Sequence, residues 1–208
     1  MAGTARTNLE VSPLAIPEVR LIVPRRHADA RGFFAEVFSA RALAAAGIAF
    51  DGVQDNQSLS HRTGTVRGLH FQVPPLAQAK LVRVARGAIF DVAVDLRRGS
   101  PSYGRHVSAV LRADSAEQLL VPVGFAHGYC TLEPETEVLY KVDAYYSAAQ
   151  DRGILWNDPD LAIEWPVAAA GAILSPKDEK LPRFKELEAA FVYEDTAPRP
   201  IGVAERSR

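Results

Sequence analysis

The sequence has almost no cysteine and no long apolar run. Cys130 is the only cysteine among 208 residues, which excludes an intrachain disulfide and a multi-cysteine metal site. No apolar stretch approaches the roughly 18 residues that cross a bilayer. The first residues lack the basic and apolar regions of a signal peptide. These absences predict a cytoplasmic protein in which Cys130 is buried packing.

An excess of charge of one sign is also missing. The chain has 24 Lys and Arg against 25 Asp and Glu, a net charge of −1, and no block of like charge. This composition argues against a nucleic-acid partner and against a membrane-surface helix. Apolar residues make up 48% of the chain, as in globular proteins with a sizeable core. The length fits one domain with short appendages.

Helical patterns are scarce, whereas short strand patterns recur along the chain. The clearest is Lys80–Arg97, in which two apolar-rich runs flank the turn signal Arg86-Gly87. Similar runs separated by turn residues predict a mainly β sandwich or barrel. Only two short helices are expected, over Ser39–Gly47 and Lys185–Phe191. From about Glu194 the polar, proline-bearing sequence predicts a loosely held terminus.

One stretch, Gly64–Gly87, has the spacing of a metal-binding barrel without its ligands. Gly64, His70, Lys80, Gly87 and the later His127 resemble the two signature motifs of the cupin superfamily, a double-sheet jelly-roll barrel. In metal-binding cupins the first motif supplies two histidines and a glutamate, and the second motif supplies a further histidine.

Two of these ligand positions are changed here. Gln72 stands at the second histidine, and Lys80 stands at the glutamate. An ammonium group has no lone pair and repels a cation, and two histidines are too few for a divalent metal. We therefore predict no metal and no cofactor. By spacing alone, Lys80 fits two interpretations equally: a positive charge inside the barrel, or a side chain that reaches the rim.

A series of ordered blocks resembles one family closely, the dTDP-4-dehydrorhamnose 3,5-epimerases. The blocks are DARGFFAE from Asp29, QDNQS from Gln54, VRGLHFQ from Val66, QAKLVRVARGAIFDVAVDLR from Gln78, VPVGFAHGY from Val121, VLYKVDAYY from Val138, ILWNDPDLAIEWP from Ile154 and LSPKD from Leu174. The resemblance implies a cupin-type jelly roll over residues 20–184, between an N-terminal extension (1–19) and a C-terminal helix and tail (185–208). It also implies a metal-free homodimer with an exchanged N-terminal strand.

The reaction implied by the resemblance is inversion at carbons 3 and 5 of dTDP-4-dehydro-6-deoxy-D-glucose, which gives dTDP-4-dehydro-L-rhamnose. Three alternatives stay open from the sequence. One is an epimerase that acts at a single carbon of a related dTDP-4-keto-deoxysugar. Another is a non-catalytic cupin that binds a sugar nucleotide, and the last is a metal-dependent cupin oxygenase.

The resemblance also implies roles for individual residues. His70 is the expected base, oriented by Asp178, and Tyr140 is the expected acid. Lys80 would stabilise the enolate, and Arg67 would share that duty or hold the diphosphate. The expected substrate contacts are Arg31, Phe34, Glu36, Gln54, Asn56, Arg67, His127, Tyr146 and Asp151, with Phe34 and Tyr146 stacking on thymine. Asp151 is the nearest match to an acidic residue common in the family, and Asp91 is a candidate support for His127.

Overall fold

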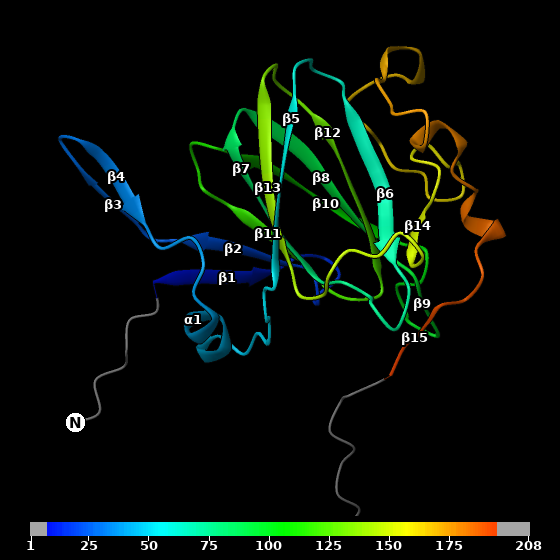
Figure 1. Cartoon of the computed structure of the whole chain (residues 1–208), viewed down its shortest axis with the longest axis horizontal. Coiled ribbons are helices and arrows are strands. Elements are labelled where there is room, and N and C mark those ends of the chain that lie inside the picture. The colour runs from blue at the N-terminus through cyan, green and yellow to red at the C-terminus, as the bar shows by residue number, and fades with distance from the viewer. Residues whose placement is uncertain (1–7, 195–208) are drawn as a thin grey trace, which may run out of the picture.

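The protein folds as two antiparallel sheets packed face to face (Figure 1). The structure is a computed structural model that describes residues 8–194. In spatial order, the six-stranded sheet contains β1 (Leu9–Pro13), β2 (Arg20–Pro24), β11 (Gln118–Val121), β7 (Lys80–Arg86), β13 (Thr136–Val142) and β5 (Gln54–Ser60). The five-stranded sheet contains β10 (His106–Arg112), β8 (Ala88–Asp95), β12 (Phe125–Thr131), β6 (Val66–Gln72) and β14 (Asp151–Gly153). The predicted mainly β jelly roll is confirmed.

The two strands predicted within Lys80–Arg97 are present, but they lie in different sheets. Gly87 turns the chain from β7 in the six-stranded sheet to β8 in the five-stranded sheet. Its backbone φ is +76°, which glycine adopts without steric cost. A Cβ atom there would lie 2.4 Å from Oγ1 of Thr136. The position therefore requires glycine for both its conformation and its space.

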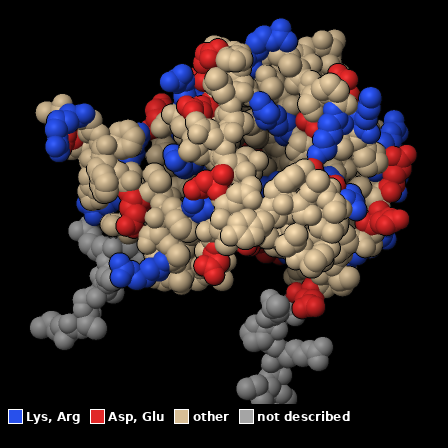
Figure 2. Space-filling view, in the orientation of Figure 1, with Lys and Arg blue, Asp and Glu red and all other residues tan. Residues whose placement is uncertain are grey.

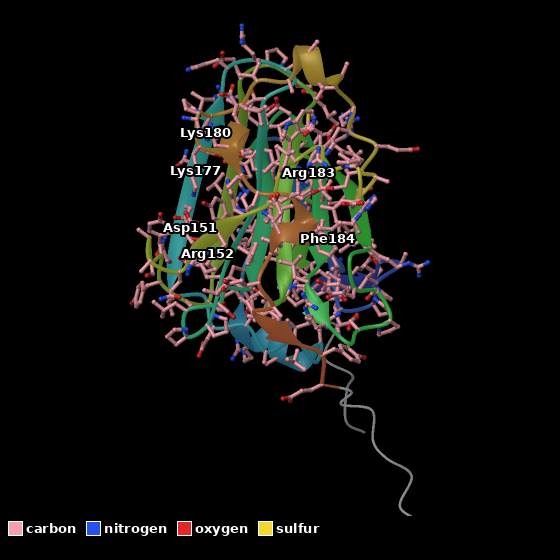
Figure 3. All side chains as sticks on the ribbon, turned by 90° about the vertical axis from the view of Figure 1, so that its right-hand side faces the viewer. Asp151, Arg152, Lys177, Lys180, Arg183 and Phe184 are labelled. Atoms are coloured by element: carbon pink, nitrogen blue, oxygen red, sulfur yellow. The ribbon has the colours of Figure 1, made fainter. Side chains whose placement is uncertain are left out.

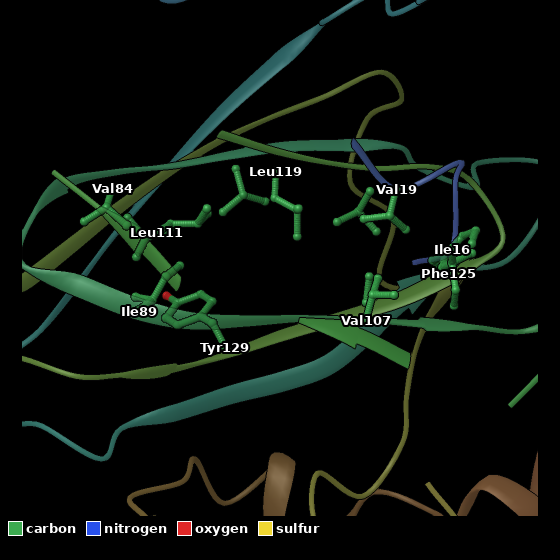
Figure 4. Packing of buried hydrophobic residues seen from close by; sticks show 13 residues of the cluster. Ile16, Val19, Val84, Ile89, Val107, Leu111, Leu119, Phe125 and Tyr129 are labelled. Carbon is green, nitrogen blue, oxygen red and sulfur yellow. The ribbon is translucent and has the colours of Figure 1, made fainter. Parts of the chain in front are cut away.

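Apolar side chains from the inner faces of both sheets fill the space between them (Figure 4). Val84 and Leu119 of the six-stranded sheet meet Ile89 and Leu111 of the five-stranded sheet. Burying each such side chain stabilises the fold by about 1.5–3 kcal/mol. Tyr129 belongs to the same cluster through its ring, while its hydroxyl group forms a hydrogen bond with Ser58 at the edge of the cluster.

The first predicted helix is confirmed as α1 (Ala40–Ala45). The Ser39 hydroxyl caps it by accepting a hydrogen bond from the Ala42 N–H at 3.3 Å. Short 3₁₀ turns form η1 (Ala169–Gly171), η2 (Asp178–Lys180) and η3 (Phe184–Glu186). Cys130 is buried against Val66 and Trp156, as predicted.

The helix predicted over residues 185–191 is wrong. After η3 the chain is extended, and β15 (Phe191–Val192) pairs in parallel with β9 (Arg97–Arg98). Seven residues are too few to sustain a helix without tertiary support. Phe184, Leu187 and Phe191 instead pack on the apolar cluster of the five-stranded sheet. The predicted tail from about residue 194 lies almost wholly outside the described residues.

The N-terminal region contributes to the barrel and also projects from it. Strand β1 falls within the predicted extension and pairs with β2 of the same chain. A separate hairpin, β3 (Arg26–Asp29) with β4 (Gly32–Ala35), extends away from the barrel (Figure 1). Phe33 and Phe34 on this hairpin are 58% and 71% exposed. Within residues 8–194, no helix is long and apolar enough to span a membrane.

Candidate active site

A cavity of about 440 Å³ lies between the two sheets, within the range of small-molecule sites. Strands of both sheets line it, together with side chains from residues 173–178. Six residues predicted from the sequence line this cavity: Arg67, His70, Lys80, His127, Tyr140 and Asp178. The fold thus brings together groups that are widely separated along the chain.

His70 of β6 is held by a carboxylate from η2. Its Nε2 atom lies 2.6 Å from Oδ1 of Asp178, which is itself buried. Burial alone would raise the pKa of Asp178, but hydrogen bonds from His70, Gly68 and Ser175 bring that pKa below its ordinary value. A carboxylate accepts the ring proton at Nε2 and leaves the lone pair at Nδ1 free to take a proton. The pair predicted from LSPKD is therefore formed.

A second histidine–carboxylate pair lies beside the first. His127 of β12 is the register partner of His70, and its Nε2 atom lies 2.5 Å from Oδ1 of Asp91 on β8. Asp91 is fully buried, and its Oδ2 atom has no hydrogen-bond partner among residues 8–194. The support of His127 by Asp91, only a candidate from the sequence, is present in the structure.

Lys80 enters the cavity from β7 and does not reach the rim. The residue is 8% exposed, and Nζ donates a hydrogen bond to the carbonyl oxygen of His70 at 3.1 Å. Burial lowers the pKa of Lys80 to about 8, against the opposing effect of Asp151 and Asp91. The ammonium forms no ion pair with a described residue. It therefore keeps two N–H donors for an oxygen that develops negative charge.

Gln72, at the other changed ligand position, forms hydrogen bonds with backbone groups through its side chain. Its amide nitrogen donates to the carbonyl oxygens of Leu76 and Tyr145, and its oxygen accepts from the Ser147 N–H at 2.6 Å. Among residues 8–194, no group of three or more His, Cys, Asp or Glu side chains is arranged to hold a metal ion. The positive charge at this point of the cavity is that of Lys80.

Tyr140 approaches from the wall opposite His70. It belongs to β13 of the six-stranded sheet, whereas His70 belongs to the five-stranded sheet. Burial raises the pKa of the Tyr140 phenol above its usual value, with Arg67 opposing that effect. The guanidinium of Arg67 is anchored on the Ser60 hydroxyl and the Leu59 carbonyl oxygen.

Four predicted contact residues form a hydrogen-bonded chain that leads to the cavity. The amide of Gln54 donates to Asn56 at 2.8 Å and accepts from the Tyr146 N–H at 3.0 Å. The Tyr146 hydroxyl donates to Asp151 at 3.3 Å, and Asp151 forms an ion pair with Lys177. Lys177 lines the cavity, and Figure 3 shows it on the same side of the molecule as Asp151.

Like the four residues of that hydrogen-bonded chain, three further predicted contacts do not line the cavity of their own chain. Arg31, Phe34 and Glu36 belong to the β3–β4 hairpin and the residue that follows it, and none of them lines the cavity. The guanidinium of Arg31 instead pairs with Asp29 at 2.6 Å. Their assignment as substrate contacts stays a prediction that requires a second copy of the chain.

Eight further residues that the sequence reasoning missed line the cavity, among them Lys177, Tyr129 and Ser58. Lys177 directly precedes Asp178 in the LSPKD block, so its place near the cavity could have been predicted from that block. Tyr129 lies two residues after His127 in β12, and strand alternation places both side chains on the same face. Ser58 occupies the corresponding inward position on β5. Lysine and arginine side chains gather around the upper part of β6 on the face seen in Figure 2, which favours an anionic ligand.

Comparison with known proteins gives one consistent result. The sequence model described as dTDP-4-dehydrorhamnose 3,5-epimerase matches residues 13–186. The chain is 50% identical to the enzyme of that name from Sinorhizobium fredii, over 93% of this chain and 98% of the relative.

Solved structures give the same result. One is the Bacillus anthracis enzyme of that name with TDP and PPi bound, at 51% identity, TM-score 0.81 and coverage of 84% and 99% of the two chains. Another is the Legionella pneumophila dTDP-6-deoxy-D-glucose-3,5-epimerase in complex with dTDP-4-keto-L-rhamnose, at 39% identity, TM-score 0.84 and coverage of 89% and 99%.

The buried ammonium predicts a pH dependence of stability. The pKa of Lys80 is about 8 in the folded protein and 10.5 ordinarily. Between pH 8 and 10.5, Lys80 is therefore mostly neutral in the folded protein and mostly protonated in the unfolded chain. The free energy of unfolding of the wild type, minus that of Lys80→Met, should therefore rise by about 3 kcal/mol from pH 8 to 10.5. Denaturant unfolding at a series of pH values measures it. An unchanged difference would contradict the burial of a charged Lys80, and Lys180→Met, an exposed lysine, is the control.

Proposed function

The chain belongs to the dTDP-4-dehydrorhamnose 3,5-epimerase family, and we propose that it inverts carbons 3 and 5 of dTDP-4-dehydro-6-deoxy-D-glucose to give dTDP-4-dehydro-L-rhamnose. The observation that carries this proposal is a facing arrangement across one cavity. The His70–Asp178 pair lies on one wall and Tyr140 on the other. The ammonium of Lys80 donates a hydrogen bond to the carbonyl oxygen of His70.

The first step breaks a carbon–hydrogen bond next to the ketone. His70 accepts the proton at its free ring nitrogen, and the electron pair of the bond moves onto the oxygen at carbon 4 as an enolate. Asp178 stabilises the imidazolium that results. Lys80 donates a hydrogen bond to the enolate oxygen, and a single donor of this kind contributes on the order of 3 kcal/mol to lowering a barrier.

The second step returns a proton to the opposite face of the same carbon. Tyr140 supplies it, because its phenol reaches the cavity from the facing sheet. A phenol is protonated at neutral pH, and burial raises the pKa of Tyr140 further. The phenolate then regains a proton from solvent and the imidazolium releases one, so both groups are reset for the second carbon.

The diphosphate requires cations near the cavity mouth. Arg67 and Lys177 line the cavity and carry the needed charge, and a guanidinium suits phosphate oxygens through its paired donors. The hydrogen-bonded series formed by Gln54, Asn56, Tyr146 and Asp151 ends at Lys177. This connection supports the assignment of these four residues as contacts to the nucleotide. His127 remains a proposed contact to the sugar.

Hydrogen exchange with solvent tests the reaction directly. In heavy water the wild type should introduce deuterium at both carbons 3 and 5 of the sugar and form the L-rhamno product. His70→Asn should lower exchange at both carbons on the order of 10²-fold or more, because the base is lost. The rates are measured by NMR and mass spectrometry.

The exposed His61 provides the matched control for that experiment. His61 pairs with Glu135 at the surface, away from the cavity, so His61→Asn should keep the wild-type rate. Exchange at one carbon only would indicate a single-carbon epimerase. Wild-type exchange by His70→Asn would overturn the assignment of the base.

We also infer that the chain acts as a homodimer in which the β3–β4 hairpin completes the partner's cavity. Strand β1 is paired within its own chain, so the hairpin is the segment available for exchange. It presents Phe33 and Phe34 to solvent, and it carries Arg31, which a nucleotide diphosphate would require. A two-fold dimer would bring each hairpin to the other subunit's site.

Complementation of two defective chains tests the exchange. One chain carries His70→Asn and the other carries Arg31→Ala with Phe34→Ala, and the mixed dimer is purified through a different tag on each. Each variant alone should be nearly inactive. The mixed dimer has one intact base facing one intact hairpin, so about half of the wild-type activity is expected. No recovery in purified mixed dimers would contradict the exchange.

A cytoplasmic location stays an inference from the sequence. The lone cysteine is buried, and the proposed substrate is a charged nucleotide sugar. Both agree with a reducing compartment that holds nucleotide pools.

A further inference from the structure

A hydrogen bond inside the cavity joins the two sheets. Oγ of Ser58 and the hydroxyl oxygen of Tyr129 lie 2.8 Å apart. Ser58 belongs to β5 in the six-stranded sheet, and Tyr129 belongs to β12 in the five-stranded sheet. Both residues line the cavity, and neither has a part in the proton transfers described above.

The Tyr129 side chain is buried, and its phenol is protonated at neutral pH. Its ring belongs to the apolar cluster between the sheets, and the residue is only 4% exposed. Burial raises the pKa of its phenol to about 12. The Tyr129 hydroxyl is therefore suited to holding a neighbour in place, whereas the half-buried Tyr140 is the phenol suited to giving up its proton.

The bond acts on a strand that has little other support. Strand β5 is the edge of its sheet, and in the described part of the chain it pairs only with β13. A second link from the facing sheet reaches it next to Ser58, where Arg67 donates to the Ser60 hydroxyl at 3.3 Å and the Leu59 carbonyl oxygen at 3.1 Å. These two links fix the separation between β5 and the opposite wall.

That separation is the distance across which the proposed chemistry takes place. On one side, Tyr140 of β13 pairs in register with Asn56 of β5, two residues from Ser58. On the other side, β12 carries Tyr129 and pairs with β6, in which His70 is the register partner of His127. The Ser58–Tyr129 bond thus connects the wall of the acid to the wall of the base.

We propose that Tyr129 is a positioning residue: its bond to Ser58 sets the gap between His70 and Tyr140, so that the enolate formed at one wall is protonated from the other. This inference rests on the proposed epimerase function. Without the bond, Tyr140 lies too far from the carbon. The imidazolium then exchanges its proton with solvent and delivers the solvent proton to the face from which the first proton came. Proton exchange then continues while inversion fails.

The test separates exchange from inversion in heavy water. For each variant, deuterium in the recovered starting sugar is compared with deuterium in the inverted product. Tyr129→Phe and Ser58→Ala should each raise the ratio of exchange to inversion roughly ten-fold, since small misplacements of a reacting group reduce rates strongly. The double variant should be no worse than either single one, because both remove the same bond. Ser58→Thr keeps a hydroxyl and should restore the ratio.

Tyr103→Phe, a tyrosine that packs on Phe184 outside the cavity, should leave the ratio unchanged. An unchanged ratio in Ser58→Ala, or additive effects in the double variant, would overturn the inference. Ser58 is only half-buried, so its variant decides the question if Tyr129→Phe does not fold. Wild-type protein that neither exchanges nor inverts would instead overturn the proposed function, and the two failures are thereby distinguished.

Discussion

The site depends on a buried ammonium group that has no carboxylate partner among residues 8–194. Lys80 lies between the sheets, is bonded to a backbone carbonyl oxygen, and has its pKa lowered to about 8 by burial. A charge in such a place interacts strongly with any opposite charge that forms near it, because little water screens the pair. An enolate oxygen supplies that charge only as the proton leaves carbon. The attraction is therefore greatest where it lowers the barrier.

In the proposed reaction, the two-sheet architecture lets one cavity act on both faces of a sugar ring. Strand alternation turns His70 inward from one sheet and Tyr140 inward from the other. Inversion needs a base and an acid on opposite sides of the carbon, and two facing walls provide this without a moving part. The same geometry makes the reaction sensitive to the gap between the walls, which the bond from Tyr129 to Ser58 spans.

The sequence predicted local features well and long-range contacts poorly. Spacing alone placed His70 and Lys80 in a barrel motif, because they lie on two strands that follow one another in the chain, β6 and β7. Asp178 is 108 positions from His70, and only the family resemblance linked them, since no periodicity reports such a contact. No pattern linked Tyr129 to Ser58, which lies 71 positions away, so their bond became visible only with both sheets assembled. The helix expected over residues 185–191 failed because packing on the barrel outweighed local propensity.

The most direct test of the central claim is hydrogen exchange at carbons 3 and 5 by Lys80→Met, with dTDP binding measured by calorimetry on the same protein. The account predicts that exchange falls on the order of 10²-fold or more, while dTDP binds within a few-fold of the wild-type affinity. Exchange near the wild-type rate in a folded, dTDP-binding Lys80→Met protein would contradict it.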